Sequence, residues 1–238
     1  MTNFLTILDC IVIFIQPDIQ TNITTLRPPD YPTIFIPCPL ESFLVSSLLT
    51  NQDWEEQEKM DHEQNIGHNR QLYSVWNEKT NMMKIVSEVN PFSSSFFVWL
   101  DIGAIRHDGY NHQQMVQKVP QDSGVLLLSV EPFTEEELSL EDEKSVADFS
   151  RLVRIGGGTI GCDQTSLERW HTAYYNTMIN NLKMGKFMGK DQIMMATTCL
   201  ETDLCLLVQR GLGDWFMLQP WLRGEINDNY TRLNLINT

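Results

Sequence analysis

One stretch of the chain places a carboxylate, a glycine and an arginine directly after an apolar run. Residues 95–100 read Ser-Phe-Phe-Val-Trp-Leu, and Asp101, Gly103 and Arg106 follow them. In open α/β sheets a ligand binds outside the carboxyl ends of the strands. Asp101 can there hold a ribose hydroxyl or a divalent cation, while Gly103 permits close backbone approach and Arg106 can pair with phosphate oxygens. The alternative is that Asp101 only caps the next turn.

A second candidate region is rich in glycine. Gly156, Gly157, Gly158 and Gly161 form a G-x-G-x-x-G pattern between an expected strand and an expected helix. The dinucleotide site of a nicotinamide oxidoreductase would need a second strand ending in an acidic residue about 20 residues later. Residues 180–186 are instead helical and then basic. The glycines therefore fit a surface of a binding site, against which a sugar or an acceptor packs, better than they fit a dinucleotide site.

The third candidate is Asp191, which follows Gly189 and Lys190 and precedes Gln192. Asp191 lies where a helix N-cap belongs, which would be a purely structural role. Beside the glycines it can also bind an acceptor, or act as a general base or a nucleophile. The two roles are compatible.

Two residues near Asp101, His107 and Asp108, could complete a metal site, but such neighbours are more often surface residues of a loop. The five histidines form no His-x-x-x-His pair. A hydrolase triad is unsupported as well, because the chain has no G-x-S-x-G elbow.

Short apolar runs between helical stretches predict the elements that position these residues. The expected strands are 10–15, 33–36, 95–100, 124–130, 151–155 and 204–208, and the expected helices are about 70–89 and 165–184. The strands do not alternate apolar and polar residues, as is typical of strands covered on both faces. The pattern predicts one α/β domain over residues 1–238, with a mostly parallel sheet, helices on both faces and 95–100 as a central strand.

The charge of the chain excludes some partners. Lys plus Arg is 17 and Asp plus Glu is 31, so the net charge is −14. This field repels phosphate backbones, so we expect no nucleic-acid binding, and an anionic substrate would need a local cation or a metal. The acidic residues 135–137 and 141–143 predict a solvated helix.

The five cysteines show no metal spacing and no disulfide framework. Cys10, Cys199 and Cys205 lie in apolar company, which favours small buried hydrophobic residues. The apolar stretch 4–15 is too short to span a membrane, so no membrane span is expected.

Taken in order, several motifs resemble a known family. They are Leu72-Tyr-x-x-Trp76-x-x-Lys79, Asn90-Pro-Phe, Phe97-x-Trp-x-Asp101-x-Gly103-x-x-Arg106, Gly156-Gly-Gly-x-x-Gly161, Trp170 and Gly189-Lys-Asp-Gln192. Over residues 10 to 220 this order resembles the HtrL/YibB (WlaTC-type) family, to which glycosyltransferase activity is ascribed. The resemblance implies a GT-A-like (Rossmann-like) fold and the transfer of a sugar from a nucleotide-sugar donor to a hydroxyl group of a carbohydrate or glycan acceptor.

The resemblance also implies roles for individual residues. They are donor binding for Asp101, Gly103 and Arg106, acceptor binding for Gly156, Gly157, Gly158 and Lys190, and catalysis for Asp191 and Gln192. The Asp101-x-Gly103 turn is similar to a reduced form of the D-x-D turn, which implies a divalent cation (Mn²⁺ or Mg²⁺) at Asp101. Gly103 stands where a second metal-binding carboxylate belongs, so a metal-free site is the other expectation.

One departure from the family concerns the start of the chain. The family begins with a strand before residues 10–15, and this chain shows no counterpart to it. The expectations are a truncated N-terminus, a vacant flank beside strand 10–15, and, as the alternative function, a non-catalytic sugar-binding or scaffold domain of the same fold. The location would be cytoplasmic as written, or the Golgi lumen if an anchor precedes the chain. We expect Asp101, Asp191 and Arg106 to face one cleft.

Overall fold

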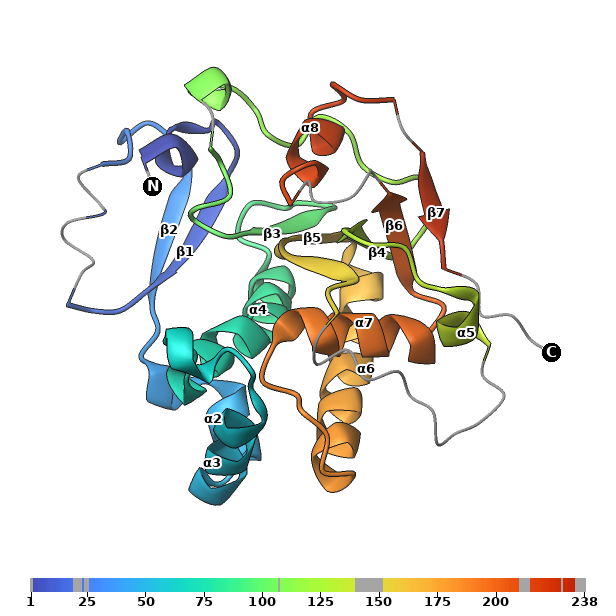
Figure 1. Ribbon diagram of the computed structural model, residues 1–238. Helices are drawn as coiled ribbons and strands as arrows, with labels where there is room; N and C mark the ends of the chain where they lie inside the picture. The colour runs from blue at the N-terminus through green and yellow to red at the C-terminus, as the bar shows by residue number, and fades with distance from the viewer. Residues whose placement is uncertain are drawn as a thin grey trace.

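The fold contains a five-stranded sheet and a separate two-stranded sheet, as the computed structural model in Figure 1 shows. The structure describes residues 2–18, 23, 26–106, 108–139, 152–209, 215–227 and 229–233. In spatial order, the larger sheet consists of β3 (Phe97–Leu100), β5 (Ile155–Cys162), β4 (Val125–Ser129), β6 (Cys205–Gln209) and β7 (Tyr230–Arg232). The smaller sheet pairs β1 (Ile11–Ile15) with β2 (Thr33–Pro37) in parallel.

The strand directions of the larger sheet differ from the expected mostly parallel arrangement. β5 runs antiparallel to β3 and to β4, and β7 runs antiparallel to β6. Within the described strands of this sheet, the one parallel pair is β4 with β6. The expectation was wrong because an apolar run reports burial on both faces, and a buried antiparallel strand shows the same pattern.

The expectation that 95–100 is a central strand was also wrong, because β3 lies at the edge of the larger sheet. Phe97 is buried, whereas Val98, Trp99 and Leu100 are only partly so. These apolar side chains line a pocket. Their hydrophobicity therefore reflects the wall of a cavity, which sequence alone does not distinguish from a sheet interior.

One strand of the larger sheet was misplaced in sequence and another was missed. The strand expected at 151–155 begins at Ile155 and runs through the glycines to Cys162. Strand β7 has three residues and no apolar run to reveal it. The glycines thus belong to a strand and not to a loop between a strand and a helix.

Helices cover both faces of the larger sheet, as expected. The helices are α2 (Leu44–Leu48), α3 (Asn51–Met60), α4 (Arg70–Val89), α5 (Glu135–Leu138), α6 (Gln164–Lys183), α7 (Asp191–Glu201) and α8 (Leu218–Leu222), with 3₁₀ turns η1 (Thr2–Thr6), η2 (Leu40–Ser42), η3 (Gln64–Ile66) and η4 (Asp108–Tyr110). On one face α4, α6 and α7 share a hydrophobic core with β4 and β5, and on the other α8 packs on β4 and β6. No described helix is long and apolar enough to cross a membrane.

The bounds expected for two long helices are confirmed to within a residue, and capping explains them. The Asn69 side chain accepts a hydrogen bond from Leu72 N–H at the start of α4, and Asn90 ends the helix in a left-handed conformation. The Asp163 side chain accepts from Ser166 N–H at the start of α6. Gly185 follows α6 with a φ of +67°. Helix α5 contains Glu135 and Glu136, which are exposed as expected, and Glu137, whose side chain is only 9% exposed and pairs with Arg154. Residues 141–143 lie outside the described part.

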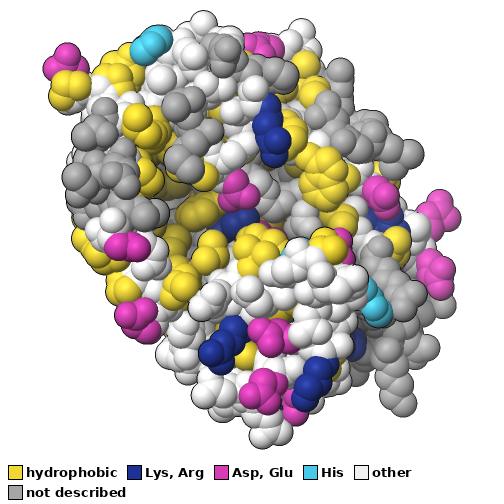
Figure 2. Space-filling view, turned by 60° about the vertical axis from the view of Figure 1, so that its left-hand side comes forward, with side chains coloured by type: hydrophobic (Ala, Val, Ile, Leu, Met, Phe, Trp, Pro, Cys, Tyr) yellow, Lys and Arg dark blue, Asp and Glu magenta, His cyan; other side chains and the backbone are white. Residues whose placement is uncertain are grey.

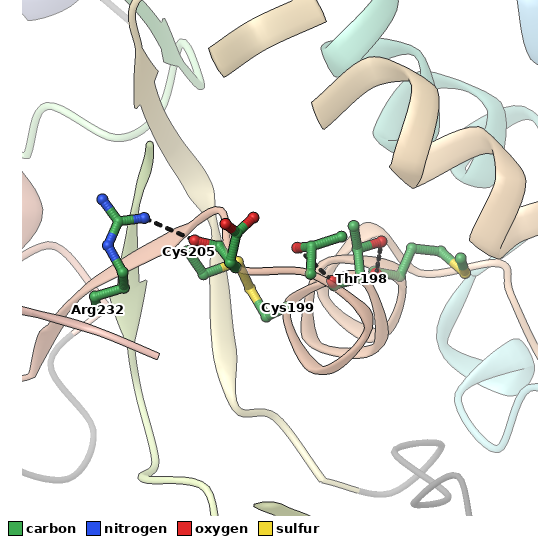
Figure 3. The surroundings of a disulfide bond; sticks show 7 residues. Thr198, Cys199, Cys205 and Arg232 are labelled. Carbon is green, nitrogen blue, oxygen red and sulfur yellow. Dashed lines mark hydrogen bonds between the residues drawn. A yellow bond between two sulfur atoms is a disulfide. The ribbon is translucent and has the colours of Figure 1, made fainter. Parts of the chain in front are cut away.

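A disulfide bond joins Cys199 in the last turn of α7 to Cys205 at the start of β6 (Figure 3). Their Cα atoms are 5.5 Å apart, and both residues are fully buried. The expectation that these two cysteines are only small buried hydrophobic residues was therefore wrong. Their spacing of six residues does not reveal that the helix and the strand turn back on each other.

Strand β1 has one open flank. Among the described residues it pairs with β2 alone. Ile11 N–H donates to the Pro32 carbonyl and Cys38 N–H to the Ile15 carbonyl, so residues 11, 13 and 15 bond to β2 and the backbone groups of residues 12 and 14 point the other way. That flank lines the pocket. Among the described residues no strand lies beside this flank of strand 10–15, as expected.

Candidate functional site

Asp101 and Asp191, the two carboxylates singled out by sequence, line one pocket of about 1160 Å³. Its walls come from β1, α4, β3 with the turn that follows it, the glycines of β5 and the first residues of α7. Figure 2 shows one face of the molecule hollowed, with hydrophobic side chains around the hollow and acidic and basic side chains together at its floor. The expectation that both aspartates face one cleft is confirmed.

The ammonium group of Lys79, on α4, connects the two aspartates. Its Nζ lies 3.1 Å from Asp101 Oδ1 and 2.8 Å from Asp191 Oδ2. It also donates a hydrogen bond of 2.8 Å to the Gly157 carbonyl oxygen. The ammonium thus donates hydrogen bonds to Asp101 and to the Gly157 carbonyl, and it forms an ion pair with Asp191. The Lys79 side chain is only 4% exposed, so the charge is compensated entirely by these groups.

Asp101 is held at the end of β3 by its own backbone and by an indole. Its N–H donates to the Gly158 carbonyl at 2.9 Å, and Trp99 Nε1 donates to its Oδ1 at 2.7 Å. The next turn is closed by the backbone carbonyl of Asp101, which accepts from Ala104 N–H at 2.8 Å. The carboxylate is therefore not a turn cap, and with 42% of its side chain exposed it is available to a ligand.

Asp191 lies deep in the site because residue 157 is a glycine. Asp191 is the first residue of α7, one position after the N-cap residue Lys190, and its Oδ1 accepts from Gln192 N–H at 2.8 Å. A Cβ atom on Gly157 would lie 2.7 Å from Asp191 Oδ2. Gly157 thus gives the carboxylate room against strand β5, a role that differs from the expected contact with an acceptor.

The charges of this group influence one another strongly. Burial disfavours the charged form of Lys79, but Asp191 and Asp101 outweigh it, so that the pKa of Lys79 lies above its ordinary value. Burial raises the pKa of Asp191, Lys79 opposes that rise, and the result is a pKa above the ordinary 3.8. A perturbed carboxyl pKa in a pocket is typical of a group that takes part in proton transfer.

The structure brings some of the remaining predicted residues to the pocket. Gly103, Arg106, Gly158 and Gln192 line it, and the Arg106 guanidinium lies 4.7 Å from the centre of the Phe216 ring. The expected cation therefore lines the same pocket as the two carboxylates.

Other predicted residues lie elsewhere. Gly156 packs toward Leu128 and Val130 on the opposite side of the strand, because successive residues of a strand face opposite sides. Lys190 points away from the pocket and pairs with Asp61 and Glu63. An acceptor-binding role for Gly156 and Lys190 is not supported by these positions, and His107 lies outside the described residues.

The pairing of Lys190 draws attention to a group that sequence reasoning missed. Asp61, Glu63 and His68 place one ligand atom each within 4.8 Å of one another, so this group could hold a metal ion. His68 Nδ1 and the Tyr73 hydroxyl both lie within hydrogen-bond distance of Asp61 Oδ2, at 2.8 and 2.7 Å. Burial disfavours an ionised Asp61, but these hydrogen bonds and one from Glu63 N–H outweigh it and lower its pKa.

The metal expected at Asp101 does not fit the residues around it. The Lys79 ammonium already lies between Asp101 and Asp191, where a bridging cation would have to be. Gly103 contributes no side-chain ligand. No step of the chemistry is therefore assigned to a metal at this position.

The role of Lys79 was also missed, although the residue belongs to one of the motifs. A clue was available, since Lys79 follows Trp76 and precedes Met83 within the apolar stripe of α4. A charged side chain on such a stripe needs a buried partner.

The chain belongs to the HtrL/YibB family. The sequence model of this family, which is described as a bacterial protein of unknown function, matches residues 44–223. The match includes Lys79, Asp101 and Asp191, and it begins later than the expected residue 10. Comparison with the curated proteins gave no match, and comparison with the solved structures gave none.

Proposed function

We propose that this chain is a glycosyltransferase that moves a sugar from a nucleotide-sugar donor to a hydroxyl group of a carbohydrate or glycan acceptor. The observation that carries the proposal is the pair of aspartates, Asp101 and Asp191, on a single buried lysine within one pocket. A largely apolar pocket with a few converging polar groups is typical of a small-molecule site.

Donor binding is proposed for the open side of this group. Asp101 would accept hydrogen bonds from ribose or sugar hydroxyls, because its carboxylate is half exposed and held in place by Trp99. Arg106 would pair with the diphosphate. A chain with a net charge of −14 needs such a local cation to attract an anion.

The transfer step is proposed for Asp191. Its carboxylate would take the proton of the acceptor hydroxyl as the hydroxyl oxygen bonds to the anomeric carbon. The bond between that carbon and the diphosphate oxygen would break, and the nucleoside diphosphate would leave with the electron pair. Gln192, which lines the pocket beside Asp191, would contact the reacting sugar.

The GT-A-like assignment is part of the same proposal. The α/β layers and the helices on both faces of the sheet support it. The antiparallel direction of β5 means that the sheet would be a variant of that fold.

A second candidate function is a non-catalytic sugar-binding domain of the same fold. The flank of β1 that has no partner strand among the described residues favours it, because a strand missing at that place would impair donor binding. A domain of this kind would bind a nucleotide or a sugar without turning over a donor.

The compartment is likewise a proposal. Disulfide bonds persist in oxidising compartments, so the bond between Cys199 and Cys205 supports the luminal alternative over a cytoplasmic location.

Thermal unfolding with nucleoside diphosphates tests the proposed site. A ligand at 100 times its Kd stabilises the native state by about 2.7 kcal/mol, so a matching nucleoside diphosphate should raise the Tm. Asp101→Asn should reduce that rise, and because it also removes one of the carboxylates that compensate the buried Lys79, the rise is measured from the unliganded Tm of the variant itself. Asp30→Asn, at an exposed position outside the pocket, is the matched control. The proposal fails if no nucleoside diphosphate raises the Tm, or if Asp101→Asn keeps the full rise.

A further inference from the structure

Three oxygen atoms surround Lys79 in a way that suits a cation. They are Asp101 Oδ1, Asp191 Oδ2 and the Gly157 carbonyl oxygen, at 3.1, 2.8 and 2.8 Å from Nζ. Two carboxylates and a carbonyl are also an oxygen set that a divalent cation prefers. We infer that Lys79 is the built-in cation of this site, so that no divalent metal binds between Asp101 and Asp191 and donor binding needs none.

The distances favour an ammonium over a metal ion. Contacts of 2.8 to 3.1 Å suit N–H···O hydrogen bonds and ion pairs, whereas Mg²⁺ and Ca²⁺ bind oxygen at about 2.0 to 2.6 Å. A metal ion among the same oxygens would come into direct contact with Nζ. Because Lys79 lies on the long helix α4 and is almost fully buried, its side chain has little room to move aside.

Electrostatic repulsion by Lys79 also disfavours a divalent metal ion between Asp101 and Asp191. A divalent ion within a few ångströms of an ammonium is repelled strongly in a site with little water. Lys79 cannot easily relieve this by losing its proton, because Asp191 and Asp101 raise its pKa despite burial. The two carboxylates and one ammonium leave one net negative charge, so the diphosphate of a donor would have to pair with Arg106.

Manganese alone, titrated into the purified full chain, tests the metal part of the inference. Calorimetry should give the same Mn²⁺ binding for wild type and for Asp101→Asn, because neither holds the ion at this position. Any binding at Asp61, Glu63 and His68 would be common to both. Wild-type binding that disappears in Asp101→Asn would overturn the inference.

Lys79→Met provides the complementary test. Removal of the ammonium leaves two carboxylates with no cation, so this variant should bind Mn²⁺ at least about tenfold more tightly than wild type. The gain should be lost again when Asp101→Asn is added. Lys84→Met, on the same helix but outside the pocket and paired with Glu88, should show no gain. A folded Lys79→Met that gains no Mn²⁺ binding would contradict the inference, and if this variant does not fold, the comparison of wild type with Asp101→Asn decides alone.

The donor part of the inference rests on the proposed function, and a chelator separates the two. The rise in Tm with a nucleoside diphosphate should be the same with EDTA as with Mn²⁺. A rise that EDTA abolishes would overturn the inference. A complete absence of any rise would contradict the proposed function, and the Mn²⁺ titrations would still decide on Lys79.

Discussion

Gly157 shows how the absence of one side chain sets the geometry of the site. The Asp191 carboxylate lies against strand β5 at the place where a Cβ of residue 157 would be. Asp191 Oδ2 is buried and accepts no hydrogen bond of favourable geometry, so its contact with Lys79 is what compensates for its burial. Any displacement of Asp191 therefore disturbs an ion pair as well as a packing contact.

Gly157→Ala should destabilise the chain. An added Cβ at 2.7 Å from Asp191 Oδ2 forces a shift, and overpacking of this kind costs about 1 to 3 kcal/mol. Gly158→Ala is the matched control, because its Cβ would meet Asp101 Oδ2 at an ordinary 3.8 Å. Urea unfolding measures both variants. A Gly157→Ala chain as stable as the wild type would show that Asp191 has more room than the structure indicates.

The pKa of Asp191 predicts the pH dependence of the proposed transfer. Burial raises this pKa above 3.8, and only the ionised carboxylate can act as a base. The rate should fall as the pH drops through the raised pKa, so the acidic limb of kcat/KM lies above pH 3.8. The linked effect on stability has the opposite sense: the folded state binds this proton more tightly, so stability from this group decreases as the pH rises through the raised pKa. An acidic limb at or below pH 3.8 would contradict the assignment.

Much of the site could be predicted from residue types and spacing, but its central contact could not. Asp101 and Asp191 stand out because each follows a recognisable boundary, the end of an apolar strand and the start of a helix. The position of Lys79 between them depends on how α4 packs on β3 and β5, which is a long-range property. The pairing of Lys190 with Asp61 and Glu63 could not be predicted either, because adjacent residues at a helix start can point in different directions.

At the scale of elements, helix α4 also shows that local sequence predicts the ends of an element better than it predicts its packing. Its bounds were predicted correctly, because Asn69 and Asn90-Pro91 mark its two ends. Its buried face was not, since Val75 of the apolar stripe is exposed while Asn77 and Glu78 are buried.

Hydrogen bonds explain why the face of α4 that carries Asn77 and Glu78 is buried. The Asn77 side chain donates to the Gly189 carbonyl at 2.9 Å and accepts from the Tyr174 hydroxyl at 2.6 Å. Glu78 accepts from the N–H groups of Leu44 and Val45. Together these contacts tie α4 to α6, α2 and the segment before α7, and so fix Lys79 against Asp191. Apolar periodicity does not report a face that is buried through hydrogen bonds.

The disulfide anchors the far end of the helix that begins with Asp191. Replacing both Cys199 and Cys205 by serine should lower the free energy of unfolding by about 2 kcal/mol, since a short closed loop restricts the unfolded chain only modestly. For a chain of this size that corresponds to a decrease in Tm of about 4 to 8 °C. Calorimetry under non-reducing conditions measures it, and Cys10→Ser, at an exposed free cysteine, is the control. A pair of serines that leaves the Tm unchanged would show that the bond does not stabilise α7.

At the scale of the whole molecule, the site is a pocket that is lined by strands of both sheets. Strand β1 of the smaller sheet and β3 of the larger sheet both line the pocket, and neither has a second partner strand in the described part of the chain. The α/β character, the helices on both faces and the vacancy beside β1 were predictable from apolar runs and order. Strand direction was not, because it depends on connections that apolar runs do not encode.

Because the chain is strongly negative, the binding of an anionic ligand depends on the positive side chains that line the pocket. Against a net charge of −14, the pocket contains Lys79 at its floor and Arg106 on its wall. Lys79 is already paired with the two carboxylates, so Arg106 is the cation that remains for a ligand among the described residues lining the pocket. The proposed donor thus depends on a single arginine for its diphosphate.

The release of nucleoside diphosphate from a panel of nucleotide sugars, with candidate saccharide acceptors present, tests the central claim most directly. The wild type should release it from at least one donor, and Asp191→Asn should be slower by about 10² to 10⁴-fold, as expected for the loss of a general base. Asp163→Asn, which changes only the cap of α6, is the control for handling and folding. If the wild type consumes no donor, or if Asp191→Asn releases the nucleotide as fast as the wild type does, the transferase assignment is contradicted.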